Sequence, residues 1–517
     1  MQDIDPIQAA VDRAETIPPP PDDRQLAFER RNDYGNARRL IARHGYDLIF
    51  VEQWGWLAWD GQRWCVEDGE AETLIRAHQT AESIFDEVAT LKDFEDPEPN
   101  EIEHPKEHEA WQRRVRIFEE NKKNLRRWAL TSGNKGKSEA MINMAAPYLR
   151  RHHTIFDVQP WAVNVKNGTL RLDEGVKLYP HSRGDHITRC ATVAYDEKAD
   201  APNWRQFVGQ VLPEKEVAVF AQKWLGYCIT GDISEQKIAQ FEGQGANGKS
   251  TLLEVVARVL GDYAVTTPIE TFLHQDKKSG SGPSPDIARL PGARFVRASE
   301  PEPGSRLSES QIKQFTGGEK ITARHLQKDF FEFAPQGKLT LSVNIRPVLV
   351  GKDHGIRRRI LVVPFTQTFA SGNGSVPGKG QTLVNELMSE APGIFNWLLD
   401  GFRLWWEDGL NVPAEIEAAT NAYFSEMDPI GSFVREACEQ TESPEDRERS
   451  ADLYQAYKSW CSANNEDEKT QTAFGRRLSD LGIKAKTVGG FGYRTCVQLR
   501  PEWRQQEANF DADLDVY

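Results

Sequence analysis

A glycine-rich loop near the middle of the chain has the spacing of a phosphate-binding site. Residues 243–250 read Gly-Gln-Gly-Ala-Asn-Gly-Lys-Ser and match the Gly-x-x-x-x-Gly-Lys-Ser pattern without adjustment. Glycines let backbone N–H groups surround phosphate oxygens, the lysine reaches the β- and γ-phosphates, and the serine hydroxyl binds Mg²⁺. We therefore expect Lys249 to act in catalysis and Ser250 to hold the metal ion. The expected nucleotide contacts are Gly243, Gly245, Ala246, Asn247, Gly248, Lys249, Ser250 and Thr251.

Hydrolysis of a nucleotide also needs a carboxylate that holds Mg²⁺ and polarises the attacking water. The segment 293–302 reads as a short strand that ends in two acids, downstream of the glycine-rich loop. Glu300 is the first candidate, both as a catalytic group and as a metal ligand, and Glu302 is the second. Two exposed loop acids without a catalytic role are the alternative.

Two further groups could act on phosphate. Asn344 ends an alternating strand pattern, where its amide can sense the γ-phosphate or orient water, although a plain turn residue remains the alternative. Arg358 and Arg359 precede another strand-like run. A guanidinium can stabilise the charge on a transferring phosphoryl group, so both are catalytic candidates, with ordinary solvated charge as the alternative.

The elements around the loop have the order that phosphate binding requires. Residues 237–241 read as a strand, and apolar residues recur at helical spacing from Leu252 to Leu260, where Gly261 ends the run. Farther upstream, Asp60-Gly61 between aromatic runs predicts a hairpin, and we interpret the tryptophans of residues 54–64 as core rather than as a base-stacking platform.

Residues 321–333 alternate on both sides of 327–329, which predicts a second hairpin with Lys328 near its tip. From Arg324 to Arg359 there are eight Lys or Arg against three acids, in a chain with a net charge of −14. Such a basic segment can hold backbone phosphates electrostatically, without reading sequence. The resemblance described below implies that this hairpin holds the DNA backbone, with Arg324, His325 and Lys328 as the expected contacts. A solvated edge hairpin is the alternative.

Composition limits the class of protein. The chain has 517 residues, of which 39% are hydrophobic and 27% charged, which suits a globular protein of about three domains. No run approaches ~18 uncharged apolar residues and the first residues lack a secretion signal, so we expect a cytoplasmic protein without membrane contact. The six cysteines are scattered, with no zinc-like spacing.

These motifs, in this order, resemble the superfamily 3 helicases, specifically the phage and plasmid primase-helicase family related to the poxvirus primase-helicase. Besides the glycine-rich loop, the resemblance rests on residues 298–302, 312–318, 321–324, 331–335, 344 and 355–360, and upstream on 156–157, 164–172 and 225–232. It implies an AAA+-like hexameric ring that hydrolyses ATP with Mg²⁺ and translocates on single-stranded DNA held in its pore. It also implies that one arginine of the 358–359 pair acts on ATP bound to the neighbouring subunit.

One departure from the family concerns primer synthesis. The chain has little room before residue 200 for a polymerising primase domain and shows no evident paired-Asp strand motif, so we expect any primase or polymerase to be a separate partner.

The C-terminal region is predicted to be a winged helix. One helix has an apolar face that includes Leu453 and Trp460, a second bears Arg476 and Arg477, and a final hairpin turns at 488–490. Such a helix can enter a major groove or pack on a neighbour, so Arg476 and Arg477 are candidate DNA contacts with packing left open.

The expected fold class is α/β: a P-loop, AAA+-like superfamily 3 helicase domain with an N-terminal α+β domain and a C-terminal winged-helix module. The expected divisions are a flexible tail (1–24), an N-terminal primase-helicase-associated α+β domain (25–200), a helical collar (201–235), an ATPase/helicase domain (236–400), a helical linker (401–449), a winged helix (450–500) and an acidic tail (501–517).

The expected function is an ATP-dependent replicative DNA helicase of a phage or mobile element. Two alternatives share the nucleotide site. A P-loop phosphotransferase has no need of the hairpin at 321–333, and a nucleotide-gated DNA-binding initiator or scaffold would bind DNA without unwinding it.

Overall fold

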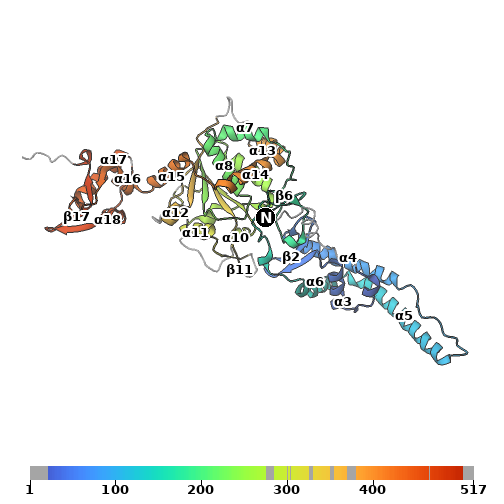
Figure 1. Ribbon diagram of the computed structural model, residues 1–517. Coiled ribbons are helices and arrows are strands. Elements are labelled where there is room, and N and C mark those ends of the chain that lie inside the picture. The colour runs from blue at the N-terminus through green and yellow to red at the C-terminus, as the bar shows by residue number, and fades with distance from the viewer. Residues whose placement is uncertain are drawn as a thin grey trace, which may run out of the picture.

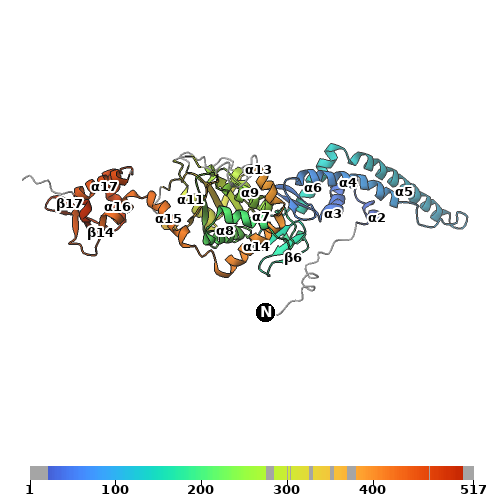
Figure 2. The same ribbon diagram turned by 90° about the horizontal axis from the view of Figure 1, so that it is seen from above.

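The computed structural model describes residues 21–274, 285–299, 301–302, 304–324, 330–349, 354–369, 380–464 and 466–504. The molecule is elongated: an N-terminal part that ends in a long helical arm and a small C-terminal module lie on opposite sides of a central α/β domain (Figures 1 and 2). No helix among these residues is long and apolar enough to cross a bilayer.

The central domain is built on a five-stranded sheet with the order β13-β7-β12-β9-β8, in which every neighbouring pair is parallel. Its strands are β7 (Ile238–Glu242), β8 (Ala264–Thr266), β9 (Phe295–Ser299), β12 (Lys338–Val343) and β13 (Ile360–Pro364). The expected α/β class is therefore confirmed, and the structure shows that its central sheet is parallel.

Both faces of the sheet are covered, as parallel sheets require. In β13, Leu361 and Val363 join one hydrophobic core, whereas Ile360 and Val362 join the core on the other face. The first core includes α7 (Pro202–Val211), α8 (Lys215–Tyr227), α9 (Lys249–Leu260), α13 (Gly380–Met388) and α14 (Ala391–Asp408). On the other side lie α10 (Pro285–Ala288), α11 (Glu309–Gly317) and α12 (His354–Arg357) (Figure 1).

The N-terminal part combines helices with two small antiparallel sheets. Its helices are α2 (Asp23–Leu26), α3 (Asp33–His44), α4 (Gly69–Thr90), α5 (Pro105–Ser132) and α6 (Lys135–Leu149). Its strands are β1 (Leu48–Val51), β2 (Gly55–Trp59), β3 (Trp64–Cys65), β4 (Ala162–Val165), β5 (Gly168–Arg171) and β6 (Lys177–Tyr179).

The hairpin predicted at Asp60-Gly61 is confirmed, because β2 and β3 pair antiparallel around this turn. Trp56, Trp59 and Trp64 are buried, and Trp54 is partly buried against the cluster that contains Trp59 and Trp64, so the interpretation of these tryptophans as core is confirmed.

The C-terminal module follows α15 (Ala414–Glu426). It consists of α16 (Pro429–Ala437), β14 (Cys438–Gln440), β15 (Arg447–Arg449), α17 (Ser450–Asn464), α18 (Gln471–Asp480), β16 (Ala485–Val488), β17 (Phe491–Thr495) and β18 (Val497–Leu499). Its hydrophobic core begins at Ile430, because α16 packs with α17 and α18.

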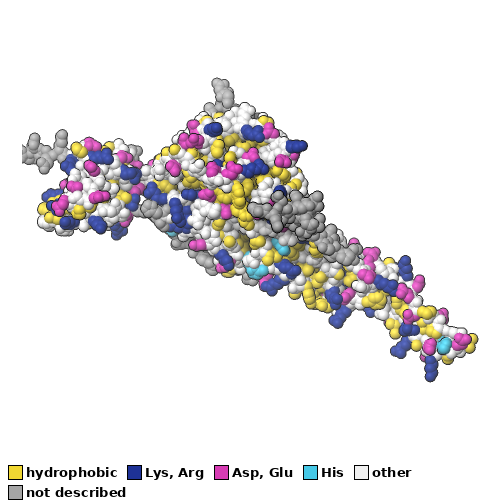
Figure 3. Space-filling view, viewed as in Figure 1, with side chains coloured by type: hydrophobic (Ala, Val, Ile, Leu, Met, Phe, Trp, Pro, Cys, Tyr) yellow, Lys and Arg dark blue, Asp and Glu magenta, His cyan; other side chains and the backbone are white. Residues whose placement is uncertain are grey.

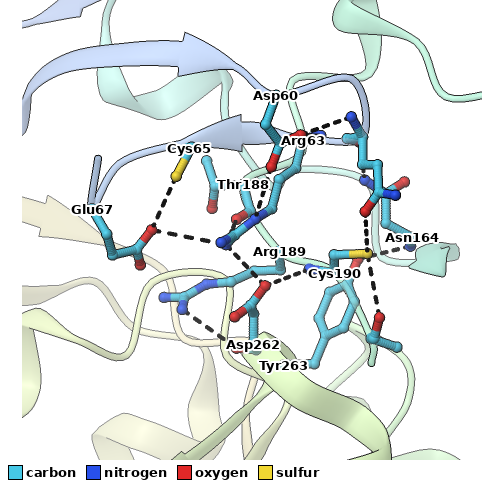
Figure 4. A network of polar contacts seen from close by, with 12 residues as sticks. Asp60, Arg63, Cys65, Glu67, Asn164, Thr188, Arg189, Cys190, Asp262 and Tyr263 are labelled. Carbon is cyan, nitrogen blue, oxygen red and sulfur yellow. Dashed lines mark hydrogen bonds and ion pairs between the residues drawn. The ribbon is translucent and has the colours of Figure 1, made fainter. Parts of the chain in front are cut away.

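A polar network joins the N-terminal part to the central domain (Figure 4). Arg63, in the β2–β3 hairpin, forms an ion pair of 2.8 Å with Asp262 and donates to Thr188 O at 2.9 Å. Asp262 also accepts from Cys190 N at 3.0 Å and lies in the single turn (Gly261–Tyr263) that follows α9. The N-terminal part therefore contacts the far end of the helix that begins at the glycine-rich loop.

A buried ion pair holds the N-terminal helices together, and we expect Glu87→Ala to destabilise this part by about 3–5 kcal/mol. Glu87 Oε2 lies 2.8 Å from Arg39 Nε, both side chains are fully buried, and Arg43 contributes a second contact of 3.1 Å. Removing the carboxylate leaves the Arg39 charge buried without its partner. Urea unfolding followed by tryptophan fluorescence measures the loss. Glu82→Ala, on the exposed face of the same helix, is the control, and an equal loss there would contradict the prediction.

Candidate nucleotide and DNA sites

The loop between β7 and α9 has the backbone shape that its glycines permit. Gly245 and Gly248 have φ angles of +87° and +84°, in the left-handed region that disfavours side chains. A Cβ on Gly248 would lie 2.3 Å from Val211 Cγ1, so α9 could not begin where it does with any other residue there. The predicted order of strand, glycine-rich loop and helix is present in the structure.

Lys249 is the first residue of α9 and is 2% exposed. Its Nζ donates to Gly243 O at 2.7 Å, to Asn247 Oδ1 at 3.1 Å and to Asn344 Oδ1 at 3.1 Å. Asn344 directly follows β12, the neighbour of β7 in the sheet. Two residues singled out separately in the sequence, Lys249 and Asn344, thus meet at the carboxyl edge of the sheet.

The loop also contains a donor that lacks a partner. Asn247 is 3% exposed, and its Nδ2 has no hydrogen-bond acceptor among the described residues. Buried polar groups are normally satisfied, so an orphaned amide beside an ammonium group suits an anionic ligand with oxygen acceptors. The donors of the loop therefore fit a phosphate.

A cavity of about 340 Å³ opens beside the start of α9. Ser250 and Thr251 line it, together with Ser299 at the end of β9 and Ser342 in β12. Glu300, the first-choice carboxylate, follows Ser299 directly but lies outside the described residues. Glu302 is described and exposed.

Sequence reasoning missed Glu254, which lines the same cavity one helical turn after Ser250. It accepts from Arg258 Nε at 2.8 Å and from Arg297 Nη2 at 2.6 Å. Burial opposes ionisation of this carboxyl, but the two arginine hydrogen bonds outweigh it and lower the pKa of Glu254. The i, i+4 spacing from Ser250 is the signal that could have identified it.

Glu242, immediately before the loop, was also missed. Arg346 Nη2 lies 2.7 Å from Glu242 Oε1, and the same guanidinium pairs with Glu426 at the end of α15. Hydrogen bonds to these two carboxylates raise the pKa of Arg346. An ion-pair chain therefore runs from the nucleotide loop to the helix that leads to the C-terminal module.

The two arginine candidates differ in their surroundings. Arg359 is buried and donates to Thr316 Oγ1 at 2.9 Å and to Gly355 O at 2.7 Å, whereas the Arg358 side chain is exposed. The backbone O of Arg358 accepts from Lys237 Nζ, at the amino end of β7. At ~3.3 Å per residue along β7, this point is roughly 20 Å from Gly243, beyond the reach of an arginine side chain. Arg358 therefore lies far from the phosphate loop of its own chain.

The predicted hairpin at 321–333 is confirmed as a strand pair: β10 (Ile321–Arg324) pairs antiparallel with β11 (Phe330–Phe333). The Arg324 guanidinium lies 5.0 Å from the centre of the Phe330 ring. His325 and Lys328 lie outside the described residues. The base of the hairpin contacts the N-terminal part, because His153 Nε2 lies 3.0 Å from Glu332 O.

Not all of the eight cations counted between Arg324 and Arg359 are free to meet a ligand. Lys338 is 2% exposed, and its Nζ donates to backbone oxygens of Asp232 and Gln336. Burial lowers the pKa of Lys338 to about 7. With Arg346 paired and Arg359 buried, these three cations have structural partners, which a count of charges along the chain cannot reveal.

The two C-terminal candidates also differ. Arg477 points toward the linker, where its Nη2 lies 2.6 Å from Asp428 Oδ2, while Arg476 is exposed on α18. Arg477 thus attaches α18 to the α15–α16 junction, and Arg476 is the one of the pair that faces solvent.

Two family models match the chain on either side of the glycine-rich loop: "D5 N terminal like" over residues 37–213 and "Poxvirus D5 protein-like" over residues 425–505. The chain belongs to the poxvirus-like primase-helicase family. The resemblance inferred from the motifs is thereby confirmed at the level of this family.

Several curated relatives of this primase-helicase family member come from viruses. "Putative helicase L207/L206" of Acanthamoeba polyphaga mimivirus is 28% identical over 324 residues, which cover 60% of the chain and 34% of that protein. "Putative helicase 022R" of Frog virus 3 is 26% identical and covers 58% and 32%, respectively. "Putative primase C962R" of African swine fever virus is 22% identical and covers 70% and 40%. The matches thus span between 32% and 40% of the length of these relatives.

Among solved structures, the C-terminal region of NrS-1 is similar to this primase-helicase family member at 11% identity, with a TM-score of 0.39. The match covers 66% of the chain and 82% of that structure. A TM-score of this size supports no further inference.

Proposed function

We propose that this chain is the ATP-hydrolysing motor of a replicative DNA helicase of a phage or other mobile element, acting as a ring, with six subunits as the expected number. The observation that supports it most is the contact of 3.1 Å between Lys249 Nζ and Asn344 Oδ1. The two residues that we propose to bind phosphate and to orient water are thus in contact at the carboxyl edge, where ligands of parallel sheets bind.

Each group at this edge has a proposed role. The loop N–H groups and Lys249 hold the phosphates, and Asn344 orients the attacking water. Ser250 and Glu300 would hold Mg²⁺, with Glu302 as the second carboxylate candidate. When bound, the ion supplies positive charge against the developing charge of the phosphates. The cavity that Ser250 lines and the unpartnered Asn247 amide support this assignment.

We propose that the ring is needed for hydrolysis. Arg358 is exposed and lies at the end of β7 opposite the loop, so any phosphate that it contacts belongs to a neighbouring subunit. Arg359, which is buried, is the weaker candidate.

DNA is proposed to contact the β10–β11 hairpin through Arg324, His325 and Lys328. The C-terminal module is proposed to be a winged helix, since strand β15, helices α17 and α18 and strands β16 and β17 follow one another in that order. Exposed Arg476 is its DNA candidate on α18. The expected domain divisions stay part of the proposal.

The proposal is tested by measuring ATP hydrolysis with and without single-stranded DNA, together with strand displacement on a forked substrate. A helicase motor shows DNA-stimulated hydrolysis and unwinding, and electron microscopy with ATP shows rings. A phosphotransferase would be insensitive to DNA. An initiator or scaffold would bind nucleotide and DNA without unwinding.

Lys328→Ala is expected to uncouple the motor. Basal hydrolysis should persist while unwinding and DNA stimulation fall about tenfold or more, because the hairpin tip is predicted to touch phosphate and not nucleotide. The slope of log affinity against log salt should flatten by about 0.7 for one lost phosphate contact. Lys177→Ala, an exposed lysine in the β5–β6 hairpin, is the matched control. Unwinding at the wild-type rate in Lys328→Ala would rule out the hairpin assignment.

A further inference from the structure

One face of the three-stranded sheet β15-β17-β16 in the C-terminal module collects cations and aromatic rings. Tyr493 of β17 lies directly opposite Arg449 of β15 and directly opposite Lys486 of β16. Directly opposed residues of antiparallel strands project from the same face of a sheet. Arg449, Tyr493 and Lys486 therefore form one cross-strand row.

The neighbouring rows extend this face. Phe491 lies two residues before Tyr493 and so shares its face. Arg447 lies opposite Thr495, and Thr495 N donates to Lys484 O at 3.0 Å, which places Lys484 beside the same row. We call Arg447, Arg449, Lys484, Lys486, Phe491 and Tyr493 the wing face.

The opposite side of the sheet packs on the module. There Arg494 donates to Ser479 Oγ of α18 at 2.8 Å, and Glu448 accepts from Leu499 N at 3.1 Å. The wing face consequently points to solvent: its four cations are exposed, and Phe491 keeps 54% of its surface accessible. Hydrophobic and basic side chains both reach the surface at the outer end of the C-terminal module (Figure 3).

The charges of the wing face are not neutralised within the sheet, because the only acid in its three strands, Glu448, lies on the opposite side. The pKa of Arg449 is raised mainly by its hydrogen bond with Tyr493 and only weakly by the charge of Asp452, in the first turn of α17. Instead of acids, the arginines contact rings. The Arg449 guanidinium lies 4.4 Å from the centre of Phe491, and that of Arg447 lies 5.2 Å from the centre of Tyr493.

We propose that the wing face binds single-stranded nucleic acid. Four exposed cations attract the backbone phosphates, and Phe491 with its neighbouring guanidinium offers flat surfaces on which unpaired bases stack. Charge complementarity selects this ligand, since four exposed cations gather on one face of a chain whose net charge is −14. The site differs from α18 and Arg476. The choice of nucleic acid as the ligand rests on the proposed function, but binding at the wing face does not depend on ATP hydrolysis.

The test measures fluorescence anisotropy of labelled oligothymidylate with the full chain, without nucleotide, in a Lys328→Ala background that weakens binding at the predicted hairpin. Replacing Arg447, Arg449 and Lys486 by alanine together should lower affinity about tenfold or more at low salt and reduce the salt slope by about 2. Phe491→Ala should lower affinity about 5- to 150-fold with an unchanged slope, and Phe491→Trp should restore it. Lys469→Ala, an exposed lysine in the loop after α17, is the matched control.

Wild-type affinity in the triple variant, or an equal loss in Lys469→Ala, would overturn the proposal. A preference for duplex over single strand that Phe491→Ala does not alter would also overturn it. Hydrolysis of ATP without DNA, measured on the same triple variant, should equal that of the wild type. If the wild-type chain fails to hydrolyse ATP, the proposed function is contradicted. The binding measurement still tests the wing face in that case, because it is made without nucleotide.

Discussion

Lys249→Ala is expected to abolish ATP hydrolysis, with turnover reduced by at least ~10²–10³-fold, because the site loses the cation aimed at the phosphates. The structure makes this expectation specific, since Lys249 Nζ contacts the loop at Gly243 and β12 at Asn344 but belongs to no hydrophobic core cluster. Steady-state phosphate release measures the effect, and nucleotide binding is followed separately with a fluorescent ATP analogue.

Lys215→Ala is the control for this variant. Lys215 is also the first residue of a helix in the same domain, α8, but it is exposed and distant from the loop in sequence. Circular dichroism and a melting curve should show that Lys249→Ala remains folded, at a cost of about 1 kcal/mol for the lost hydrogen bonds. Wild-type turnover in folded Lys249→Ala would show that this loop is not the phosphate site.

Arg358→Ala is expected to reduce turnover by ~10³–10⁵-fold while ATP affinity changes much less, as for other arginine fingers. The reason is geometric: Arg358 is exposed and lies beside Lys237, at the opposite end of β7 from the loop, so it can serve only the site of a neighbour. Single-turnover hydrolysis combined with equilibrium ATP binding separates the two effects.

Mixing Arg358→Ala with Lys249→Ala subunits should restore part of the activity, since some interfaces then combine an intact loop with an intact arginine. Arg357→Ala is the matched control, because Arg357 lies against the Phe424 ring at 4.8 Å. Arg359→Ala should mainly lower stability, through loss of the bonds to Thr316 and Gly355. The trans assignment fails if dilute monomers hydrolyse ATP at the full rate, or if Arg358→Ala and Arg359→Ala both keep wild-type turnover.

Much of the nucleotide loop could be predicted because its signals are local. Gly245 and Gly248 adopt φ angles that only glycine tolerates readily, so the positions of these glycines predict the conformation of the loop. The apolar period of α9 and the alternation of β10 and β11 are likewise short-range patterns, and both elements are present. The family, too, was evident from the order of such motifs.

Charge partners could not be predicted, because they come from distant parts of the chain. Arg346 pairs with Glu242 and Glu426, and Arg477 pairs with Asp428. No local sequence pattern predicts these ion pairs. Lys338 is one of the eight cations counted in the basic segment, yet it is buried at the start of a parallel strand that is covered on both faces. The net charge of a segment therefore overstated how many of its cations face solvent.

The sequence by itself determined the glycine-rich loop, the strand–loop–helix order, the α/β class and the membership of the poxvirus-like primase-helicase family. Only the tertiary structure decided that Asn344 meets Lys249, that Arg358 and not Arg359 faces outward, and that one side of the β15-β17-β16 sheet gathers exposed cations. The physical reason is range: backbone conformation and periodicity are encoded over a few neighbouring residues, whereas burial, strand register and ion pairing depend on which distant segments pack together.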